Sequence, residues 1–345
     1  MAVVRERGED VRRFILEHVP ENPAHIARAT AEKFAISRQA VNKHLRRLVA
    51  EGVLLAEGNA RRLRYKLRPL ETWTQRYDLA PGLAEDVVWR QDIVPALGKL
   101  PANALDIWHY GFTEIFNNAI DHSEGTRVSV RIEKTASHSE VAVYDNGVGI
   151  FKKIQRELGL LDERHSVLEL AKGKLTTDPA NHTGEGIFFS SRMFDAFQIQ
   201  SGGVYFSHSF GDERDWILER ENPGRDGTSV WMVLNNHTSR TTKNIFEQFT
   251  SGDDLAFTKT VVPVKLAQYG EDKLVSRSQA KRLLARVERF KTVILDFSGV
   301  DSIGQAFSDE IFRVFTNKHP EIDLFEVNAS DLVQQMIRRA RAARE

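Results

Sequence analysis

The sequence has no cysteine among its 345 residues. This excludes disulfide bonds, thiol catalysis and metal sites built from thiolates. The sequence also lacks an apolar run that approaches the roughly 18 residues of a membrane span, and no apolar core of signal-peptide length follows its charged first residues. We therefore expect a cytoplasmic protein that is not embedded in a membrane.

A net charge of one sign is absent as well, because 48 Lys and Arg balance 48 Asp and Glu. The charges are unevenly distributed, since residues 1–70 contain 15 Lys and Arg against 8 Asp and Glu. The basic N-terminal end is therefore the expected contact for a polyanion. A length of 345 residues exceeds what one hydrophobic core usually holds, so two or three domains are expected.

The most informative segment is E-I-F-N-N-A-I-D-H-S at residues 114–123. Spacings of three and four place Glu114, Asn118, Asp121 and His122 on one face of a predicted helix. A Glu and an Asn four residues apart can share a magnesium ion and an activated water, because this ion prefers hard oxygen ligands. For this helix taken alone, a solvated polar face is the alternative interpretation.

Two glycine pairs follow this helix. Asp145 ends the short alternating strand V-A-V-Y-D, and Gly147 and Gly149 allow the backbone to turn sharply and approach a ligand. The Asp145 carboxylate can accept a hydrogen bond from an exocyclic amine, although an Asp followed by glycines is often only a turn. Gly184 and Gly186 lead into I-F-F-S-S-R-M-F, a predicted helix whose N-terminal N–H groups can bind phosphate.

In this order and spacing, the motifs resemble the GHKL family of ATPases (HATPase_c, the Bergerat fold). This family includes gyrase, heat-shock chaperones, histidine kinases, mismatch-repair ATPases and anti-sigma serine kinases. Glu114–Asn118 resembles the asparagine box, Asp145–Gly149 the adenine-binding glycine box, and Thr183–Ile187 the glycine box that closes the ATP lid. Gly227–Thr228 before the strand S-V-W-M-V-L resembles the last family element. The resemblance covers about residues 100–235.

The resemblance implies that Asp145 binds the adenine amine, that Asn118 binds Mg²⁺, and that Glu114 is the general base. Many histidine kinases lack a catalytic Glu at this position, whereas hydrolysing members and anti-sigma serine kinases commonly have one. A histidine kinase would also need a phosphoacceptor, and the nearby His109 is expected to have a packing role. The other residues that the resemblance places at the nucleotide are Gly147, Gly149, Thr183, Gly184, Gly186 and Thr228.

Residues 151–183 are expected to form the mobile lid of this site. The segment L-A-K-G-K-L-T-T within it offers Lys172 and Lys174 as point charges for the triphosphate. A solvated lysine pair is the alternative interpretation.

The basic N-terminal segment has the pattern of a helix-turn-helix. Helices are expected over residues 9–19 and 24–34, and Ser37 is expected to cap a third helix. A turn with the sequence E-G-N-A then joins two short strands and resembles the basic wing of winged-helix regulators. The expected DNA contacts are Ser37, Arg38, Gln39, Asn42, Lys43, Arg46, Arg61, Arg62 and Arg64. A protein-docking module is the alternative interpretation.

Alternating strands and helices after about residue 256 predict a small α/β domain. Val293–Gly304 resembles the sulfate-transporter and anti-sigma-antagonist (STAS) domain. Phosphorylatable members carry an Asp-Ser-Ser-Gly run, but Gly304–Phe307 reads G-Q-A-F here, so the acceptor serine is missing. Ser302 and Ser308 flank this run and leave phosphorylation as an alternative, although Ser302 is expected to cap a helix. A fused pseudo-substrate that docks on the ATPase explains the domain without chemistry.

Together these patterns predict a multidomain α+β protein. We expect a winged helix at 1–70, a linker and helix at 71–100, an α/β-sandwich ATPase at 101–236, a connector at 237–255 and a STAS-like domain at 256–345. The expected function is an ATP- and Mg²⁺-binding transcription regulator, with Mg²⁺-dependent ATPase activity, that binds DNA. An anti-sigma-type serine/threonine kinase acting on a partner protein is the alternative. A nucleotide-binding scaffold with negligible turnover, in which Glu114 only helps to place Mg²⁺, is the third interpretation. A homodimer is expected, as is a protein partner for the STAS-like domain.

Overall fold

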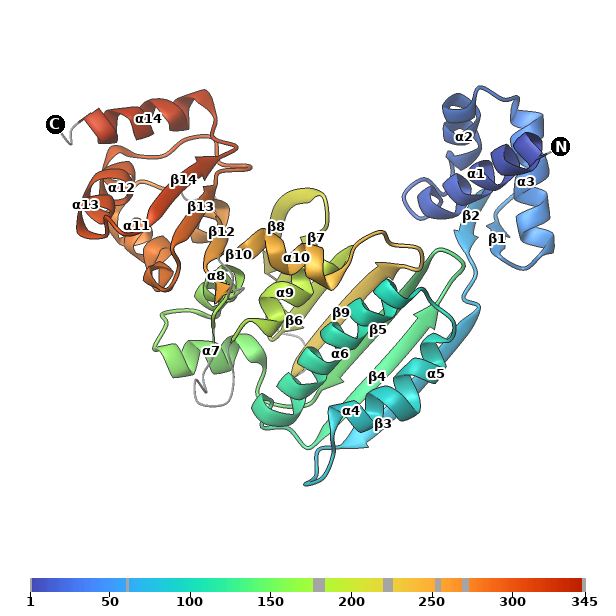
Figure 1. Cartoon of the computed structure of the whole chain (residues 1–345), viewed down its shortest axis with the longest axis horizontal. Coiled ribbons are helices and arrows are strands. Elements are labelled where there is room, and N and C mark those ends of the chain that lie inside the picture. Colours follow the sequence, from blue (N-terminus) through green and yellow to red (C-terminus); the bar gives the residue numbers. More distant parts are fainter. Residues whose placement is uncertain are drawn as a thin grey trace.

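The computed structural model describes residues 2–59, 62–175, 184–219, 226–251, 256–268 and 273–342. Figure 1 shows an N-terminal helical unit, a central sheet with its helices, and a C-terminal unit. Buried apolar side chains from Val11 to Tyr65 form one core, and a second core runs from Val88 to Ala340. The central and C-terminal units therefore share one continuous core. No helix in the described ranges is long and apolar enough to cross a membrane.

The N-terminal unit consists of three helices and a β-hairpin. The predicted cap of the third helix is confirmed, because the Ser37 hydroxyl oxygen accepts a hydrogen bond from the Ala40 N–H at 3.2 Å. Val41, Leu45 and Leu48 are buried on its inner face, as their spacing predicts. The elements are α1 (Ala2–His18), α2 (Ile26–Phe34), α3 (Arg38–Ala50), β1 (Leu54–Glu57) and β2 (Arg64–Leu67).

The central sheet has seven strands in the order β3-β4-β5-β9-β6-β7-β8, and every neighbouring pair is antiparallel. Alternating burial along β9 places one face of the sheet in the core. The strands are β3 (Glu71–Asp78), β4 (Arg127–Lys134), β5 (His138–Asp145), β6 (Ala196–Ser201), β7 (Val204–Ser209), β8 (Asp212–Glu219) and β9 (Thr228–Asn235).

Strand β3 corrects the linker predicted at the start of residues 71–100, whereas helical segments over residues 85–97 agree with the helix predicted after it. It pairs with β4 from Glu71 opposite Lys134 to Asp78 opposite Arg127 and forms an edge of the sheet. Its sequence, E-T-W-T-Q-R-Y-D, offers only Trp73 and Tyr77 to the core. An edge strand with so few apolar residues lacks the alternation by which a strand is found in sequence.

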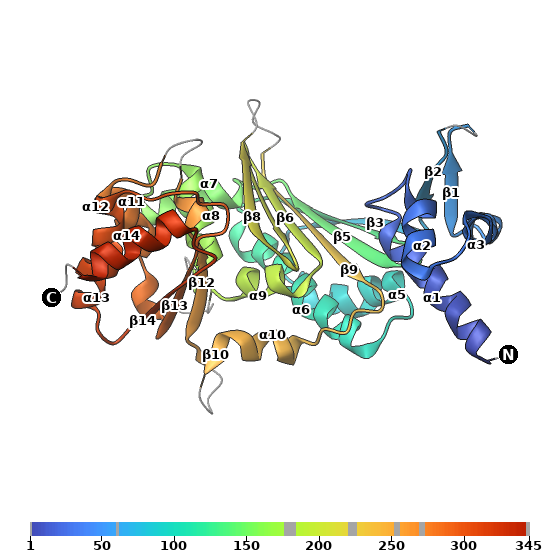
Figure 2. The same cartoon turned by 90° about the horizontal axis from the view of Figure 1, so that it is seen from above.

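Helices pack on the apolar face of the sheet, and Figure 2 shows α6 and α9 on the same side of it. Helix α6 buries Trp108, Phe112 and Phe116 against this face. The predicted lid contains two helices, α7 and α8. The helices of the central unit are α4 (Glu85–Val88), the π-helical η1 (Trp89–Ile93), α5 (Val94–Leu97), α6 (Ala102–His122), α7 (Ile150–Leu158), α8 (Glu163–Lys172), α9 (Gly186–Met193) and α10 (Thr242–Phe249).

The C-terminal unit is built on a parallel three-stranded sheet in the order β12-β13-β14. The predicted alternation of strands and helices is confirmed, since β14 and α14 lie where D-L-F-E-V and D-L-V-Q-Q-M-I-R-R-A-R predict them. The elements are β10 (Thr250–Ser251), β11 (Ala256–Phe257), β12 (Lys259–Pro263), η2 (Val264–Ala267), α11 (Arg277–Leu284), η3 (Val287–Arg289), β13 (Thr292–Asp296), α12 (Gln305–Asp309), η4 (Glu310–Phe315), α13 (Thr316–Lys318), β14 (Asp323–Val327) and α14 (Asp331–Ala342).

Candidate functional site

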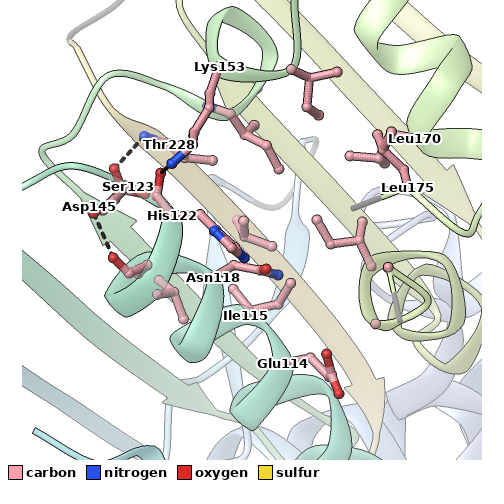
Figure 3. A pocket seen from close by; sticks show the side chains of 18 of the residues that line it. Glu114, Ile115, Asn118, His122, Ser123, Asp145, Lys153, Leu170, Leu175 and Thr228 are labelled. Atoms are coloured by element: carbon pink, nitrogen blue, oxygen red, sulfur yellow. Dashed lines mark hydrogen bonds between the residues drawn. The ribbon is translucent and has the colours of Figure 1, made fainter. Parts of the chain in front are cut away.

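A cavity of about 310 Å³ lies between α6, the sheet, the start of α7 and the segment around α9. Its size falls at the lower end of the range for small-molecule sites. Figure 3 shows Glu114, Asn118 and His122 on α6, with Asp145 and Thr228 at the strand ends. The polar residues that line the cavity are Glu114, Asn118, His122, Ser123, Asp145, Lys153 and Thr228.

Glu114 lies at one end of the cavity, against the backbone of α9. A Cβ atom added at Gly186 would lie 1.9 Å from Glu114 Oε2 and 2.6 Å from its Cδ. Burial raises the pKa of the neighbouring Tyr110 hydroxyl, and the negative charges of Glu114 and Glu185 add to this shift. The first turn of α9 is thus in direct contact with a carboxylate, and only glycine fits at residue 186 while that carboxylate keeps its position.

Asp145 lies at the other end, held by the backbone of two loops. Its Oδ1 accepts hydrogen bonds from the Gly147 N–H at 2.9 Å and the Thr228 N–H at 3.2 Å. The Thr228 hydroxyl oxygen in turn accepts the Ile150 N–H at 3.0 Å. Burial raises the pKa of Asp145, and these N–H groups oppose the shift. The carboxylate therefore has a fixed orientation beside the cavity.

Gly147 and Gly149 pack the glycine loop against other parts of the protein and do not line the cavity. A Cβ at Gly147 would lie 1.9 Å from the Ser123 carbonyl oxygen at the end of α6. Gly149 has a φ of +89°, and a Cβ there would lie 2.4 Å from Ser201 Oγ. The structure therefore does not support the predicted direct contact of these two glycines with a nucleotide. They allow Asp145 to reach its place.

Lys153 lines the cavity, although the sequence motifs did not predict it as a site residue. Its Nζ donates to the His122 carbonyl oxygen at 2.8 Å and lies 3.3 Å from Glu124 Oε1. Its side chain is only 14 % exposed. Helical spacing could have indicated it, because Ile150 and Ile154, which also line the cavity, share its face of α7.

The predicted contact of Lys172 with a triphosphate is wrong. Lys172 is 1 % exposed and does not line the cavity. Its Nζ donates to Glu169 Oε1 at 2.8 Å and to the carbonyl oxygens of Arg282 and Ala285 at 3.0 and 2.8 Å. Burial lowers the pKa of this ammonium, and Glu169 opposes the shift. The side chain points into the C-terminal unit because α8 packs there.

Lys174 is also directed away from the cavity. Its Nζ donates to the Arg289 carbonyl oxygen at 3.2 Å and lies 5.0 Å from the centre of the Phe290 ring. Leu170 and Leu175, which flank the two lysines, line the cavity in their place. Gly184 lines it too, and its carbonyl oxygen accepts the Leu175 N–H at 3.0 Å. Thr183, another predicted site residue, lies outside the described residues.

The predicted DNA contacts all lie in the N-terminal unit and do not line the cavity. Arg38, Gln39, Asn42, Lys43 and Arg46 are all exposed on α3, together with the cap Ser37. Arg62 and Arg64 are exposed at the hairpin, and Arg61 lies outside the described residues. The predicted DNA contacts that lie within the described residues are thus all solvent-exposed.

His109 has the packing role that the sequence predicts. Its ring stacks on Trp89, with the ring centres 4.9 Å apart.

Comparison with protein families defines two parts of the chain. Residues 61–206 match the histidine kinase-like ATPase domain, and this range contains Glu114, Asn118 and Asp145. Residues 279–334 match a STAS-like domain of unknown function (DUF4325). The chain therefore combines an ATPase domain of the histidine-kinase type with a STAS-like domain. No curated protein matches the chain.

Proposed function

We propose that this protein is an ATP-dependent regulator in which the nucleotide site controls a DNA-binding winged helix. The observation that carries the proposal is the contact between Glu114 and Gly186 in a cavity closed at its other end by Asp145. A carboxylate that activates water as general base and a buried acceptor for an amine are the two groups that an ATPase needs at opposite ends of its substrate.

The residues of the cavity fit ATP as follows. Asp145 accepts the adenine amine, because its Oδ1 is already oriented by two N–H donors. Glu114 acts as general base for water, and Gly184 and Gly186 bring backbone N–H groups toward the phosphates. Lys153 lines the cavity and supplies a positive charge for the phosphates.

Mg²⁺ fits this site only if the phosphates complete its ligand set. The described residues contain no cluster of three or more His, Asp or Glu side chains that could hold a metal. Asn118 supplies one oxygen ligand, which agrees with the preference of Mg²⁺ for few protein ligands together with water and phosphate. When bound, the ion neutralises the charge that develops on the phosphates.

DNA binding is proposed for the N-terminal unit. Support comes from three helices followed by a hairpin, from the excess of basic residues, and from the exposed side chains of α3. In this proposal the ATP-bound and ATP-free forms of the protein differ in their affinity for DNA, so binding of ATP changes that affinity. Fluorescence-anisotropy titrations of a DNA duplex that give the same affinity with and without magnesium-ATP would exclude that coupling.

The decisive experiment incubates the protein with γ-labelled ATP and magnesium and measures both free phosphate and label retained on protein. Glu114→Gln and Asn118→Ala test the site, and Glu157→Gln on the exposed face of α7 is the matched control. Free phosphate that is lost in both site variants but not in the control supports an ATPase switch. Turnover that persists in Glu114→Gln contradicts the role of Glu114 as general base.

A serine/threonine kinase is the second candidate, and the state of the STAS-like domain favours a substrate outside this chain. The aligned acceptor positions are held by Gln305 and Ala306, and the nearby Ser308 is 1 % exposed and donates to the Met336 carbonyl oxygen. Label transferred from ATP to an added partner protein, with loss in Glu114→Gln, would identify this activity.

A further inference from the structure

The C-terminal unit is attached to the ATPase domain through a buried ion cluster. The Nζ of Lys172, at the end of α8, donates to the carbonyl oxygens of Arg282 and Ala285, where α11 ends. The Arg282 carbonyl also accepts the N–H of Ala285, the C-cap residue of α11, at 3.3 Å, and the end of a helix favours a cation. A lysine from one unit thus caps a helix of the other.

Glu169 completes this cluster from the same turn of α8. Its Oε1 accepts from Lys172 at 2.8 Å, and its Oε2 lies 3.2 Å from the Arg286 guanidinium. We call Glu169, Lys172 and Arg286, with the carbonyls of Arg282 and Ala285, the interdomain clamp. Glu169 is 5 % exposed and Lys172 1 %, so separating the two units would leave both charges without their partners across the interface.

Hydrogen bonds and aromatic packing extend the interface beyond the clamp. The Thr260 hydroxyl of β12 donates to the Lys172 carbonyl oxygen at 2.6 Å. The Phe257 ring lies between Phe188 of α9 and Phe290, with ring centres 4.8 and 5.2 Å apart. Gly173 adjoins this cluster, where a Cβ would lie 2.8 Å from the Phe257 ring.

The same short segment forms the wall of the nucleotide cavity. Leu170 and Leu175 line the cavity on either side of Lys172, and Phe188 lines it from α9. The Leu175 N–H donates to the Gly184 carbonyl oxygen. Residues that touch the C-terminal unit therefore alternate with residues that face the cavity, so this wall is in direct contact with the docked unit.

We propose that docking of the C-terminal unit through the interdomain clamp sets the nucleotide affinity of the ATPase site. The proposal rests on nucleotide binding at the cavity, as proposed above. The docked unit holds Leu170, Leu175 and Gly184 in the wall, so the docked state binds nucleotide more tightly than the undocked state. By reciprocity, bound nucleotide favours docking by the same factor. The STAS-like domain thereby acts as a regulatory domain for the ATPase domain of the same chain.

The test measures binding of a non-hydrolysable ATP analogue with magnesium to Lys172→Met and Thr260→Val. Lys172→Met removes the ammonium with little change of shape, and Thr260→Val removes one hydrogen bond from the opposite side of the interface. Lys281→Met, on the exposed face of α11 and 70 % exposed, is the matched control. Because the chain has no cysteine, cysteines introduced at the exposed Glu157 and Lys318 can carry a fluorophore pair that reports docking.

We expect each interface variant to reduce energy transfer and to weaken binding by roughly 5- to 150-fold, the usual range of coupling between sites. Saturating analogue should restore part of the lost transfer, and Lys281→Met should match the wild type. Undocking with unchanged or tighter binding would overturn the proposal, as would docking that persists in both variants. If Lys172→Met does not fold, Thr260→Val provides the same comparison. A wild-type protein that binds no analogue would instead refute the nucleotide site itself.

Discussion

Replacing Gly186 by alanine tests where the Glu114 carboxylate lies. The new methyl group would lie 1.9 Å from Glu114 Oε2 and 2.6 Å from Cδ, far inside van der Waals contact. Those atoms are the far end of a flexible side chain, so the carboxylate rotates away while the backbone stays. Alanine is also favoured over glycine in a helix by up to about 1 kcal/mol. We expect a folded protein whose general base is displaced.

The magnitude follows from the loss of that base. General-base catalysis contributes roughly 10²- to 10⁴-fold, so ATP turnover in Gly186→Ala should fall by at least about 10²-fold. Phosphate release under steady-state conditions measures the rate, and equilibrium binding of the analogue shows that the cavity still admits nucleotide. Gly8→Ala is the matched control, because Gly8 lies in α1 and a Cβ there meets nothing within 4 Å.

A double-mutant cycle identifies the cause of the loss. In a Glu114→Gln background, Gly186→Ala should slow turnover little further, because the base is already absent. Equal losses in both backgrounds would show that Gly186 acts independently of Glu114. Full turnover in Gly186→Ala alone would refute the role of the Glu114 carboxylate in this position.

Three further predictions concern the ends of the cavity and the N-terminal unit. Burial raises the pKa of Asp145 above the ordinary 3.8, so acidification protonates this acceptor at a higher pH than usual. As the pH falls, analogue binding should decline at a higher pH than the titration of an ordinary aspartate would give, because the carboxylate is lost earlier, whereas Asp145→Asn should bind weakly throughout. Lys153→Met should weaken binding roughly tenfold or more in calorimetry, as expected for a charge-assisted hydrogen bond, and the exposed Lys152→Met should have no effect. Arg38→Ala should weaken binding to a DNA duplex and reduce the slope of log K against log salt concentration by about one. Arg28→Ala on α2 should leave both the affinity and the slope unchanged. A slope that Arg38→Ala does not alter would contradict the proposed contact.

Short-range patterns in the sequence predicted much of the fold. Ser37 caps α3 because a hydroxyl three residues before an N–H can satisfy it locally. The strands and helices of the C-terminal unit follow from alternating and helical periods within windows of 5 to 12 residues. Strand β3 was missed because it is an edge strand, and its pairing with β4 depends on residues 49 to 63 positions away.

The sequence by itself determined several of the polar residues that meet at the cavity. Each of these residues belongs to a short local motif, either one face of a helix or a glycine turn, and is therefore recognisable in the sequence. They are Glu114, Asn118, Asp145 and Thr228. Only the tertiary structure decided which lysine reaches the cavity. Lys153 lines it and Lys172 does not, although both lie in helices of the predicted lid, because the packing of α8 on the C-terminal unit fixes the direction of Lys172. The side-chain direction of a helical residue follows from what its helix packs against, and that contact joins segments 110 residues apart.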